Sequence, residues 1–116
     1  MRVIVCGGRN YANREFMAEV IRGLAPETTV VHGAAPGADT LAGELAKERG
    51  LAVEEHPADW KKYGRSAGPL RNREMLAAGA ELVVAFPGGA GTGHMLGIAR
   101  EAGLMIQDFS ADPRAL

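Results

Sequence analysis

Cysteine is almost absent from this chain of 116 residues, in which Cys6 stands alone. A single cysteine excludes an internal disulfide and is typical of a reducing compartment, so we expect a cytoplasmic protein. An excess of one charge is lacking too, because 13 Lys and Arg residues stand against 14 Asp and Glu residues, giving a net charge of −1. This balance provides no general attraction to nucleic acid or to an acidic membrane, and we expect neither as the main partner.

Long hydrophobic runs are missing as well. No apolar run approaches the ~20 residues of a membrane span, and the run at residues 2–6 is too short for a signal peptide. Aromatic residues make up 5% of the chain against a hydrophobic share of 47%, so we expect a core of aliphatic side chains. The length suits one small domain.

Glycine, by contrast, is abundant, and several of the 16 glycines fall within residues 88–93. The apolar run 81–86 predicts a buried strand that ends at Pro87, and a helical pattern begins directly after the glycines. Such a turn can adopt positive φ and approach a ligand closely, and the N-terminus of the following helix favours an anion. Thr92 is expected to cap that helix or to contact a phosphate oxygen. A strand-to-helix turn without a ligand is the alternative.

Apolar segments of strand length alternate with segments of helical periodicity. The predicted strands cover residues 2–6, 28–32, 51–56, 81–86 and 104–107. The third strand contains Glu54 and Glu55 and belongs at a sheet edge, whereas the first and fourth are expected to be central neighbours. We therefore predict a single α/β, Rossmann-like three-layer domain over residues 1–107, with a parallel five-stranded sheet in the order 3-2-1-4-5 and an irregular tail at 108–116.

The segment 57–68 has no periodicity and is predicted to be a loop with one helical turn. Together with the next helix, which we expect Ser66 or Gly68 to cap, it forms a basic stretch. Its positive residues are Lys61, Lys62, Arg65, Arg71 and Arg73. A solvated face is one interpretation and phosphate contact is the other. Trp60 and Tyr63 fit packing better than base stacking.

Strand order decides which loops matter. In a sheet of this order the crossover direction reverses between the first and fourth strands, and ligands bind beyond the C-terminal strand ends at that point. Loops rich in small residues leave those ends at residues 7–9, 32–39 and 87–92, and we expect them to converge on one crevice. Asp39 is interpreted either as a first-turn carboxylate favoured by the helix dipole or as an acceptor for a ribose or base.

Several common chemistries have no motif here. The P-loop pattern is absent, and no Gly-x-Gly-x-x-Gly follows the first strand, which disfavours P-loop NTPases and ordinary NAD dehydrogenases. His32, His56 and His94 lie far apart and show no metal-ligand spacing. We predict neither a metal nor a cofactor, and we expect Cys6 to be an inert core thiol.

Four short motifs occur in order along the chain: Cys-Gly-Gly-Arg at 6–9, His-Gly-x-x-x-Gly-Ala-Asp at 32–39, Gly-Pro-x-Arg-Asn at 68–72 and Phe-Pro-Gly-Gly-x-Gly-Thr at 86–92. Together they resemble the YspA-type branch of the SLOG superfamily, which is named for the Smf/DprA proteins and the lonely-guy enzymes. The resemblance covers about residues 2–107 and implies a nucleotide pocket. The expected ligand-binding residues are Gly7, Gly8, Arg9, Gly33, Gly37, Asp39, Arg71, Asn72, Gly88, Gly89, Gly91 and Thr92.

The resemblance also bears on catalysis. Lonely-guy enzymes cleave the N-glycosidic bond of nucleoside monophosphates, using an Arg that corresponds to Arg71 and a Glu whose position is occupied here by His94. Without that Glu, Asp39 or Glu74 would have to supply a carboxylate, so an enzyme would rely on Arg71, His94 and Asp39. The second motif also differs from the SLOG pattern, because Ala34 and Pro36 stand where the resemblance implies a glycine and a basic residue.

The resemblance leaves more than one function open. Other SLOG branches bind nucleotide-derived ligands without turnover, and still others bind DNA. We expect binding or sensing of a small nucleotide or an ADP-ribose-like molecule. A phosphoribohydrolase and a single-strand nucleic-acid binder that uses residues 60–73 are the alternatives. Relatives of this fold commonly pair through helix faces, so a homodimer is expected.

Overall fold

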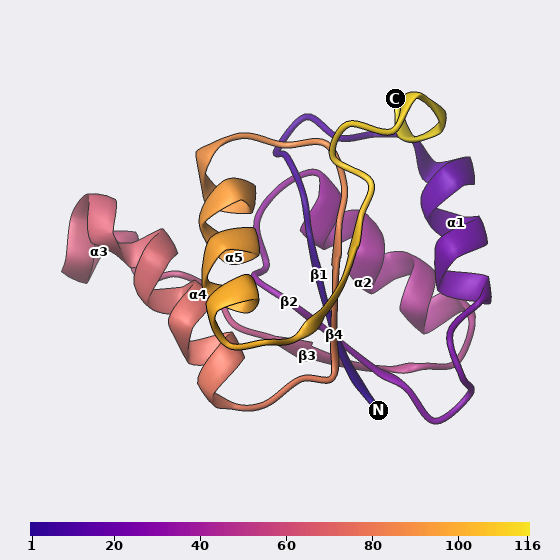
Figure 1. The fold of residues 1–116 in the computed structure, drawn as a ribbon, viewed down its shortest axis with the longest axis horizontal. Helices are drawn as coiled ribbons and strands as arrows, with labels where there is room; N and C mark the ends of the chain where they lie inside the picture. Colours follow the sequence, from indigo (N-terminus) through magenta and orange to yellow (C-terminus); the bar gives the residue numbers. More distant parts are fainter.

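The most apolar strands form the centre of the sheet, as predicted. The computed structural model describes residues 1–116. Strand β1 (Arg2–Cys6) lies between β2 (Thr29–His32) and β4 (Leu82–Ala85), and the outer strands are β3 (Ala52–Glu55) and β5 (Met105–Asp108). All neighbours are parallel, in the order β3-β2-β1-β4-β5, which confirms the predicted topology (Figure 1).

Burial explains which strands are central. Every residue of β4 is buried, and so are all residues of β1 after Arg2, because helices cover both faces of the sheet. The polar strand β3 lies at the edge, where the side chain of Glu54 accepts two hydrogen bonds from the guanidinium of Arg2 at 2.7 and 2.6 Å. The edge position therefore keeps the carboxylates of β3 out of the core.

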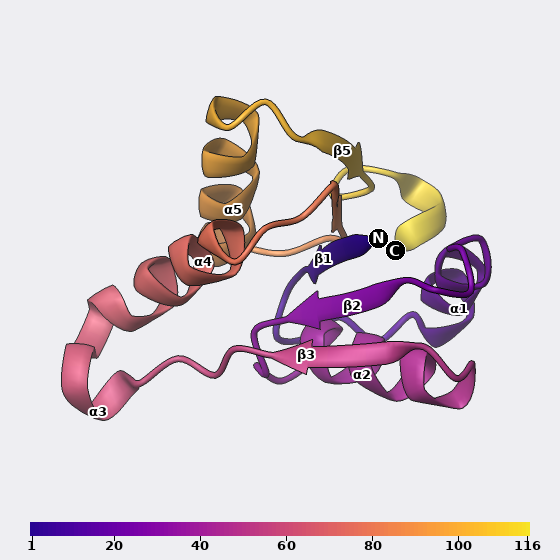
Figure 2. The same cartoon turned by 90° about the horizontal axis from the view of Figure 1, so that it is seen from below.

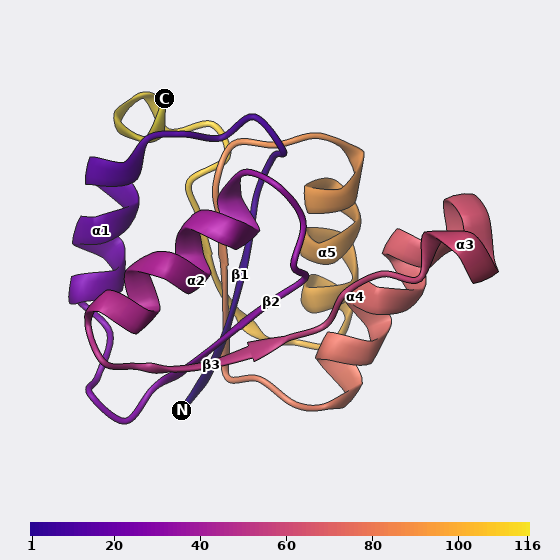
Figure 3. The same cartoon turned by 180° about the vertical axis from the view of Figure 1, so that it is seen from behind.

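Two pairs of helices form the outer layers. Helices α1 (Arg14–Arg22) and α2 (Ala38–Glu48) cover one face of the sheet, and α4 (Ala67–Ala77) and α5 (Ala90–Glu101) cover the other (Figures 2 and 3). Two separate groups of buried side chains fill the spaces between helices and sheet, one on each face. This is the three-layer arrangement expected from the alternating pattern. No helix is long and apolar enough to cross a membrane.

The helix ends follow local signals with one exception. Asn13 caps α1, since its Oδ1 accepts a hydrogen bond from the N–H of Phe16 at 3.1 Å. Gly50 follows α2 with a φ of 83°, the left-handed conformation that a glycine after a helix favours. Ser66 stands at the cap position of α4, but its hydroxyl makes no capping bond, because the preceding 3₁₀ turn continues directly into the helix.

The aperiodic segment projects from the body of the protein. It contains one helical turn, α3 (Trp60–Tyr63), followed by the 3₁₀ turn η1 (Gly64–Ser66), and Figure 2 shows α3 lying beyond the end of the sheet. Trp60 and Tyr63, for which packing was the favoured interpretation, are 48% and 45% exposed. Their rings are only partly covered because the projecting turn has little of the core within reach.

The C-terminal segment is more ordered than its sequence suggests. Strand β5 extends to Asp108, and a 3₁₀ turn, η2 (Pro113–Ala115), ends with Ala115 fully buried. The ring of Phe109 packs against Phe16 and Phe86, with ring centroids 5.1 and 5.8 Å apart. This aromatic contact holds the segment that we expected to be irregular.

Candidate functional site

The loops after β1, β2 and β4 meet at one end of the sheet, as the strand order predicted. The N–H of Gly8 donates to the carbonyl of Pro87 at 2.8 Å, which joins the first loop to the last. The carbonyl of Gly8 accepts from the N–H of Ala38 at 3.0 Å, which joins it to the loop after β2. Gly8 is therefore the point at which all the loops are held together.

Close packing explains two of the glycines. A Cβ on Gly88 would lie 2.6 Å from the nitrogen of Gly8 and against Oγ1 of Thr92, and a Cβ on Gly37, whose φ is 79°, would collide with the backbone of the first loop. The turn at residues 88–93 does not use the positive φ that its glycines permit. Gly88 is required there because two backbones approach each other closely, and not because of an unusual conformation.

A cavity of about 520 Å³ opens beside this junction, between α4 and α5. Most of the predicted ligand-binding and catalytic residues line it. They are Gly7, Gly8, Arg9, Asp39, Arg71, Asn72, Gly89, Gly91, Thr92 and His94. Gly33, Gly37 and Gly88 do not line it, because Gly37 and Gly88 are used in contacts between loops and Gly33 lies beneath Arg71.

Positive charge dominates the cavity lining. Arg9, Arg65 and Arg71 contribute guanidinium groups, and the only carboxylate is that of Asp39. Helix α5 begins at the same place with Gly89 as its N-cap, and no side chain caps it. The first N–H groups of the helix therefore remain unpaired beside the cavity, at the positive end of the helix dipole.

Arg71 crosses from α4 to the loop after β2. Its Nη1 donates to the carbonyl of Gly33 and its Nε to Oδ1 of Asn72 at 3.0 Å, which leaves its other N–H groups free. A Cβ on Gly33 would lie 2.6 Å from Cζ of Arg71. Gly33 thus makes room for the guanidinium, and its predicted contact with a ligand is replaced in this structure by a contact with Arg71.

Asn72 connects the two helices that border the cavity. It is 5% exposed, and its Nδ2 donates to the carbonyl of Gly91 at 3.2 Å and to Nδ1 of His94 at 3.1 Å. Because Nδ1 of His94 accepts this bond, the proton of the neutral ring resides on Nε2. Asn72 therefore sets both the orientation and the tautomer of His94.

Asp39 holds the loop after β2. Its Oδ2 accepts from the N–H groups of Gly33 at 3.1 Å and Ala35 at 3.3 Å. The side chain is 7% exposed, and burial raises the pKa of its carboxyl, although the bonds from the backbone partly offset that shift. Asp39 lies in the first turn of α2, where its structural interpretation places it, and its Oδ1 makes no hydrogen bond within the chain.

Glu74 does not supply the second carboxylate that an enzyme would need. Its Oε1 lies 2.8 Å from Nδ1 of His56, at the edge of the sheet, and it does not line the cavity. Glu74 lies three residues after Arg71 on α4, but the two side chains have different partners: Arg71 bonds to Gly33 and Glu74 to His56. The suggestion that Glu74 acts in the site was therefore wrong.

Comparison with known proteins establishes the family. Residues 1–63 match the model of the YspA, cpYpsA-related SLOG family. The Gene 61 protein of Mycobacterium phage D29 is 37% identical over 123 aligned positions, which cover 97% of this chain and 98% of that protein. The chain belongs to the YspA, cpYpsA-related SLOG family. The motif resemblance in the sequence is thereby confirmed.

The fold of this SLOG chain is shared by a larger protein. The structure of DNA processing protein A (DprA) from Streptococcus pneumoniae matches 92% of the chain with a TM-score of 0.78 and 20% sequence identity. The chain spans 49% of DprA, so about half of that protein has no counterpart here. At this identity the likeness shows the fold alone.

Sequence reasoning did not assign some residues of the cavity lining to the site. Gly68 and Pro69 line the cavity, and their place in the third motif was a signal that we did not use. Met75 also lines it, but its spacing on α4 is that of an ordinary core residue and gave no signal. Cys6 lies there too, and burial raises the pKa of its thiol to about 12, in keeping with an inert cysteine.

Proposed function

We propose that this SLOG chain binds a small nucleotide or nucleotide-derived ligand, such as a nucleoside monophosphate or an ADP-ribose-like molecule, with a phosphate at the N-terminus of α5. One observation carries the proposal. The uncapped N-terminus of α5 opens into a cavity of about 520 Å³ whose lining includes Arg9, Arg65 and Arg71. That volume lies within the range of small-molecule sites, and membership of the SLOG superfamily agrees with nucleotide binding or processing.

The phosphate has suitable partners on both sides. Gly89 and Gly91 have no side chain, and a Cβ at either position would meet no atom within 4 Å, so an anion can approach the helix N–H groups directly. Arg71 already uses part of its guanidinium for Gly33 and Asn72, and its free N–H groups are held in place by those bonds. Because these groups are already ordered before a ligand binds, binding loses less conformational entropy, which favours affinity.

The nucleoside has partners further out. Trp60 lines the same cavity and is 48% exposed, and the guanidinium of Arg9 lies 5.7 Å from its ring centroid. A base that stacks on Trp60 would cover this exposed ring. Oδ1 of Asp39 is the candidate acceptor for a ribose hydroxyl, since Oδ2 is already occupied by backbone N–H groups.

Binding without turnover has better support than hydrolysis. A phosphoribohydrolase stabilises an oxocarbenium ion and activates a water molecule, tasks that suit a free carboxylate. The one carboxylate in the lining, Asp39, is buried, and its Oδ2 already accepts two backbone N–H groups of the loop after β2. Incubation with nucleoside monophosphates and chromatography for free base tests the alternative directly.

Nucleic-acid binding is the weaker alternative. Lys61 and Lys62 of α3 are exposed to solvent, which suits a polyanion, but the net charge of −1 gives no general attraction. DprA is named a DNA processing protein, and its 20% identity to this chain carries only the fold. A gel shift with oligonucleotides at several salt concentrations separates the two functions. Light scattering would test the expected homodimer.

The decisive experiment compares two arginines. Arg65 lines the cavity, whereas Arg73 is exposed on α4 and lines no part of it. A thermal-shift and calorimetric series with AMP, ADP and ADP-ribose should show stabilisation of the native chain, about 2.7 kcal/mol at a hundredfold excess over Kd. Arg65→Ala should weaken binding about tenfold, while Arg73→Ala should leave the affinity unchanged. Failure of every nucleotide to bind would refute the proposal.

A steric variant locates the phosphate. Gly91→Ala adds a methyl group that meets no protein atom, and Gly97→Ala does the same farther along α5, outside the cavity. Both should stabilise the helix by up to about 1 kcal/mol. Only Gly91→Ala should weaken nucleotide binding, because its methyl group enters the space proposed for the phosphate. Equal affinities in the two variants would place the ligand elsewhere.

A further inference from the structure

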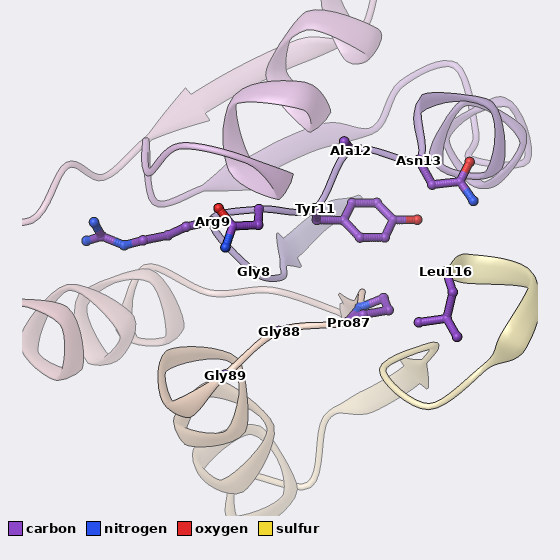
Figure 4. Close-up of a pocket in the computed structure, with 10 residues that line it drawn as sticks. Gly8, Arg9, Tyr11, Ala12, Asn13, Pro87, Gly88, Gly89 and Leu116 are labelled. Carbon is purple, nitrogen blue, oxygen red and sulfur yellow. The ribbon is translucent and has the colours of Figure 1, made fainter.

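A second cavity lies on the other side of the loop junction. It has a volume of about 690 Å³ and is bordered by residues 8–13 after β1, by residues 87–89 after β4, and by Leu116 (Figure 4). The expected phosphate-binding residues Arg65 and Arg71 are not part of its lining. Apart from Arg9, which extends away from it, its lining side chains are uncharged.

One residue that lines this second cavity has a buried polar group without a partner. Tyr11 is only 9% exposed, its ring packs against Phe86 with centroids 5.3 Å apart, and its hydroxyl makes no hydrogen bond. Figure 4 shows the phenol directed along the cavity toward Leu116, which is 79% exposed. An unpaired buried hydroxyl is unfavourable, so a ligand group that bonded to it would be stabilised.

The ridge between the two cavities is open at Gly89. Gly8, Arg9 and Gly89 line both cavities, and two of these residues have no side chain. A Cβ on Gly89 would meet no atom within 4 Å, so nothing stands above the ridge at that point. Figure 4 shows Arg9 and Tyr11 pointing in opposite directions from the same loop, one toward each end of this path. Gly89 is also the N-cap of α5, so the ridge carries the positive end of the helix dipole.

Charge therefore varies along a continuous path, with guanidinium groups at one end, helix N–H groups in the middle and neutral polar groups at the other end. We infer that the two cavities bind one two-ended ligand, a nucleoside pyrophosphate whose far phosphate carries a second sugar or ring that occupies the cavity at Tyr11. The pyrophosphate lies over Gly8 and Gly89, and a hydroxyl of the second ring bonds to the Tyr11 phenol. This inference rests on the proposed function and selects among its ligands.

Calorimetry with AMP, ADP and ADP-ribose on the full chain tests the inference, because the three compounds differ in whether they reach the second cavity. ADP-ribose should bind more tightly than ADP or AMP. Tyr11→Phe removes only the unpaired hydroxyl and should fold normally, which a thermal melt checks. It should weaken ADP-ribose about threefold to tenfold, as expected for one hydrogen bond, and leave AMP unchanged.

Two further variants keep the result interpretable. Tyr63→Phe makes the same change on the exposed turn α3, outside both cavities, and should alter no affinity. Asn10→Ala removes an exposed amide from the second cavity and should again weaken ADP-ribose more than AMP. Equal binding of AMP and ADP-ribose, or a tight ADP-ribose that neither Tyr11→Phe nor Asn10→Ala weakens, would overturn the inference and leave nucleotide binding intact. Absence of binding by all three compounds would overturn both proposals.

Discussion

The two sides of the arginine-lined cavity are built in different ways. One side, the glycine wall, consists of residues 7–9 and 89–92 and presents mainly backbone. The other, the side-chain wall, consists of residues 60–75 and presents Trp60, Arg65, Arg71 and Asn72. The glycine wall continues directly from β1 and β4, which are buried in the sheet, whereas the side-chain wall begins in the projecting turn α3.

This difference separates two requirements of a binding site. Backbone that continues from buried strands is held by the core and cannot shift without disturbing it. The side chains of Trp60 and Arg65 lie on an exposed segment, and the guanidinium of Arg71 is held by hydrogen bonds to Gly33 and Asn72. Under the proposed function, the glycine wall determines where the phosphate lies, and the side-chain wall determines which ligand is selected.

The largest effect on stability is expected at Gly88, which packs beside the glycine wall between Gly8 and Thr92. Gly88→Ala places a Cβ 2.6 Å from the nitrogen of Gly8 and against the buried Thr92, and neither group has room to move. Overpacking of this kind should lower the free energy of unfolding by about 3 kcal/mol, measured by denaturant titration. Gly93→Ala, whose Cβ meets nothing, is the matched control and should not destabilise. A stable Gly88→Ala protein would show that the loops are not in close contact.

A smaller effect is expected from the side-chain wall. Asn72→Ala removes the bonds to Arg71, Gly91 and His94, and the partners left without them should lower the free energy of unfolding by about 2 kcal/mol. Arg73→Ala, at the next position on α4, is exposed and should change stability by less than about 0.5 kcal/mol. If the two variants had the same free energy of unfolding, the hydrogen bonds of Asn72 between α4 and α5 would not contribute to stability.

The smallest effect concerns pH and the attachment of α4 to β3. The imidazole of His56 lies between Glu54 at 2.6 Å and Glu74 at 2.8 Å. Burial lowers the pKa of His56, but the bonds to the two carboxylates outweigh it, so the net pKa is raised above 6.5. The bond from Arg2, aided by that from His56, lowers the pKa of Glu54 from 4.5 to about 2.

The directions of these two pKa shifts define the pH range in which the pairing stabilises the fold. Because its pKa is raised, His56 contributes its full stabilisation below pH 6.5, and this stabilisation is lost as pH rises through the pKa of the folded state. Glu54, whose pKa is lowered, contributes its full stabilisation above pH 4.5, and this is lost as pH falls toward about 2. The stability difference between wild type and His56→Gln should thus be largest between these limits and decline above pH 7. Burial lowers the pKa of His32, so His32 makes the opposite contribution to the pH dependence of stability. That contribution is the same in wild type and His56→Gln and cancels when their stabilities are subtracted. A flat difference across pH 5–9 would contradict the pairing.

Much of the cavity lining could be predicted from the sequence, because the loops that form it directly follow the predicted strands. The positions of Gly8, Gly89 and Gly91 came from the spacing of apolar runs and glycines, and the strand order placed them together. The exposure of Trp60 was missed because an isolated aromatic residue has no periodicity from which its surroundings can be inferred. The order of the C-terminal segment was missed because Phe109 packs on Phe16, a contact across most of the chain length.

The amino-acid sequence by itself determined the strand order, the edge position of β3 and the location of the glycine loops, because apolarity and turn chemistry are properties of neighbouring residues. Only the tertiary structure decided that Arg71 faces the cavity while Glu74 bonds to His56, and that Gly88 serves packing while Gly89 stays open. The reason is geometric: residues a few positions apart on a helix or turn have the same local propensities. Which neighbour each one meets depends on segments far away in the chain.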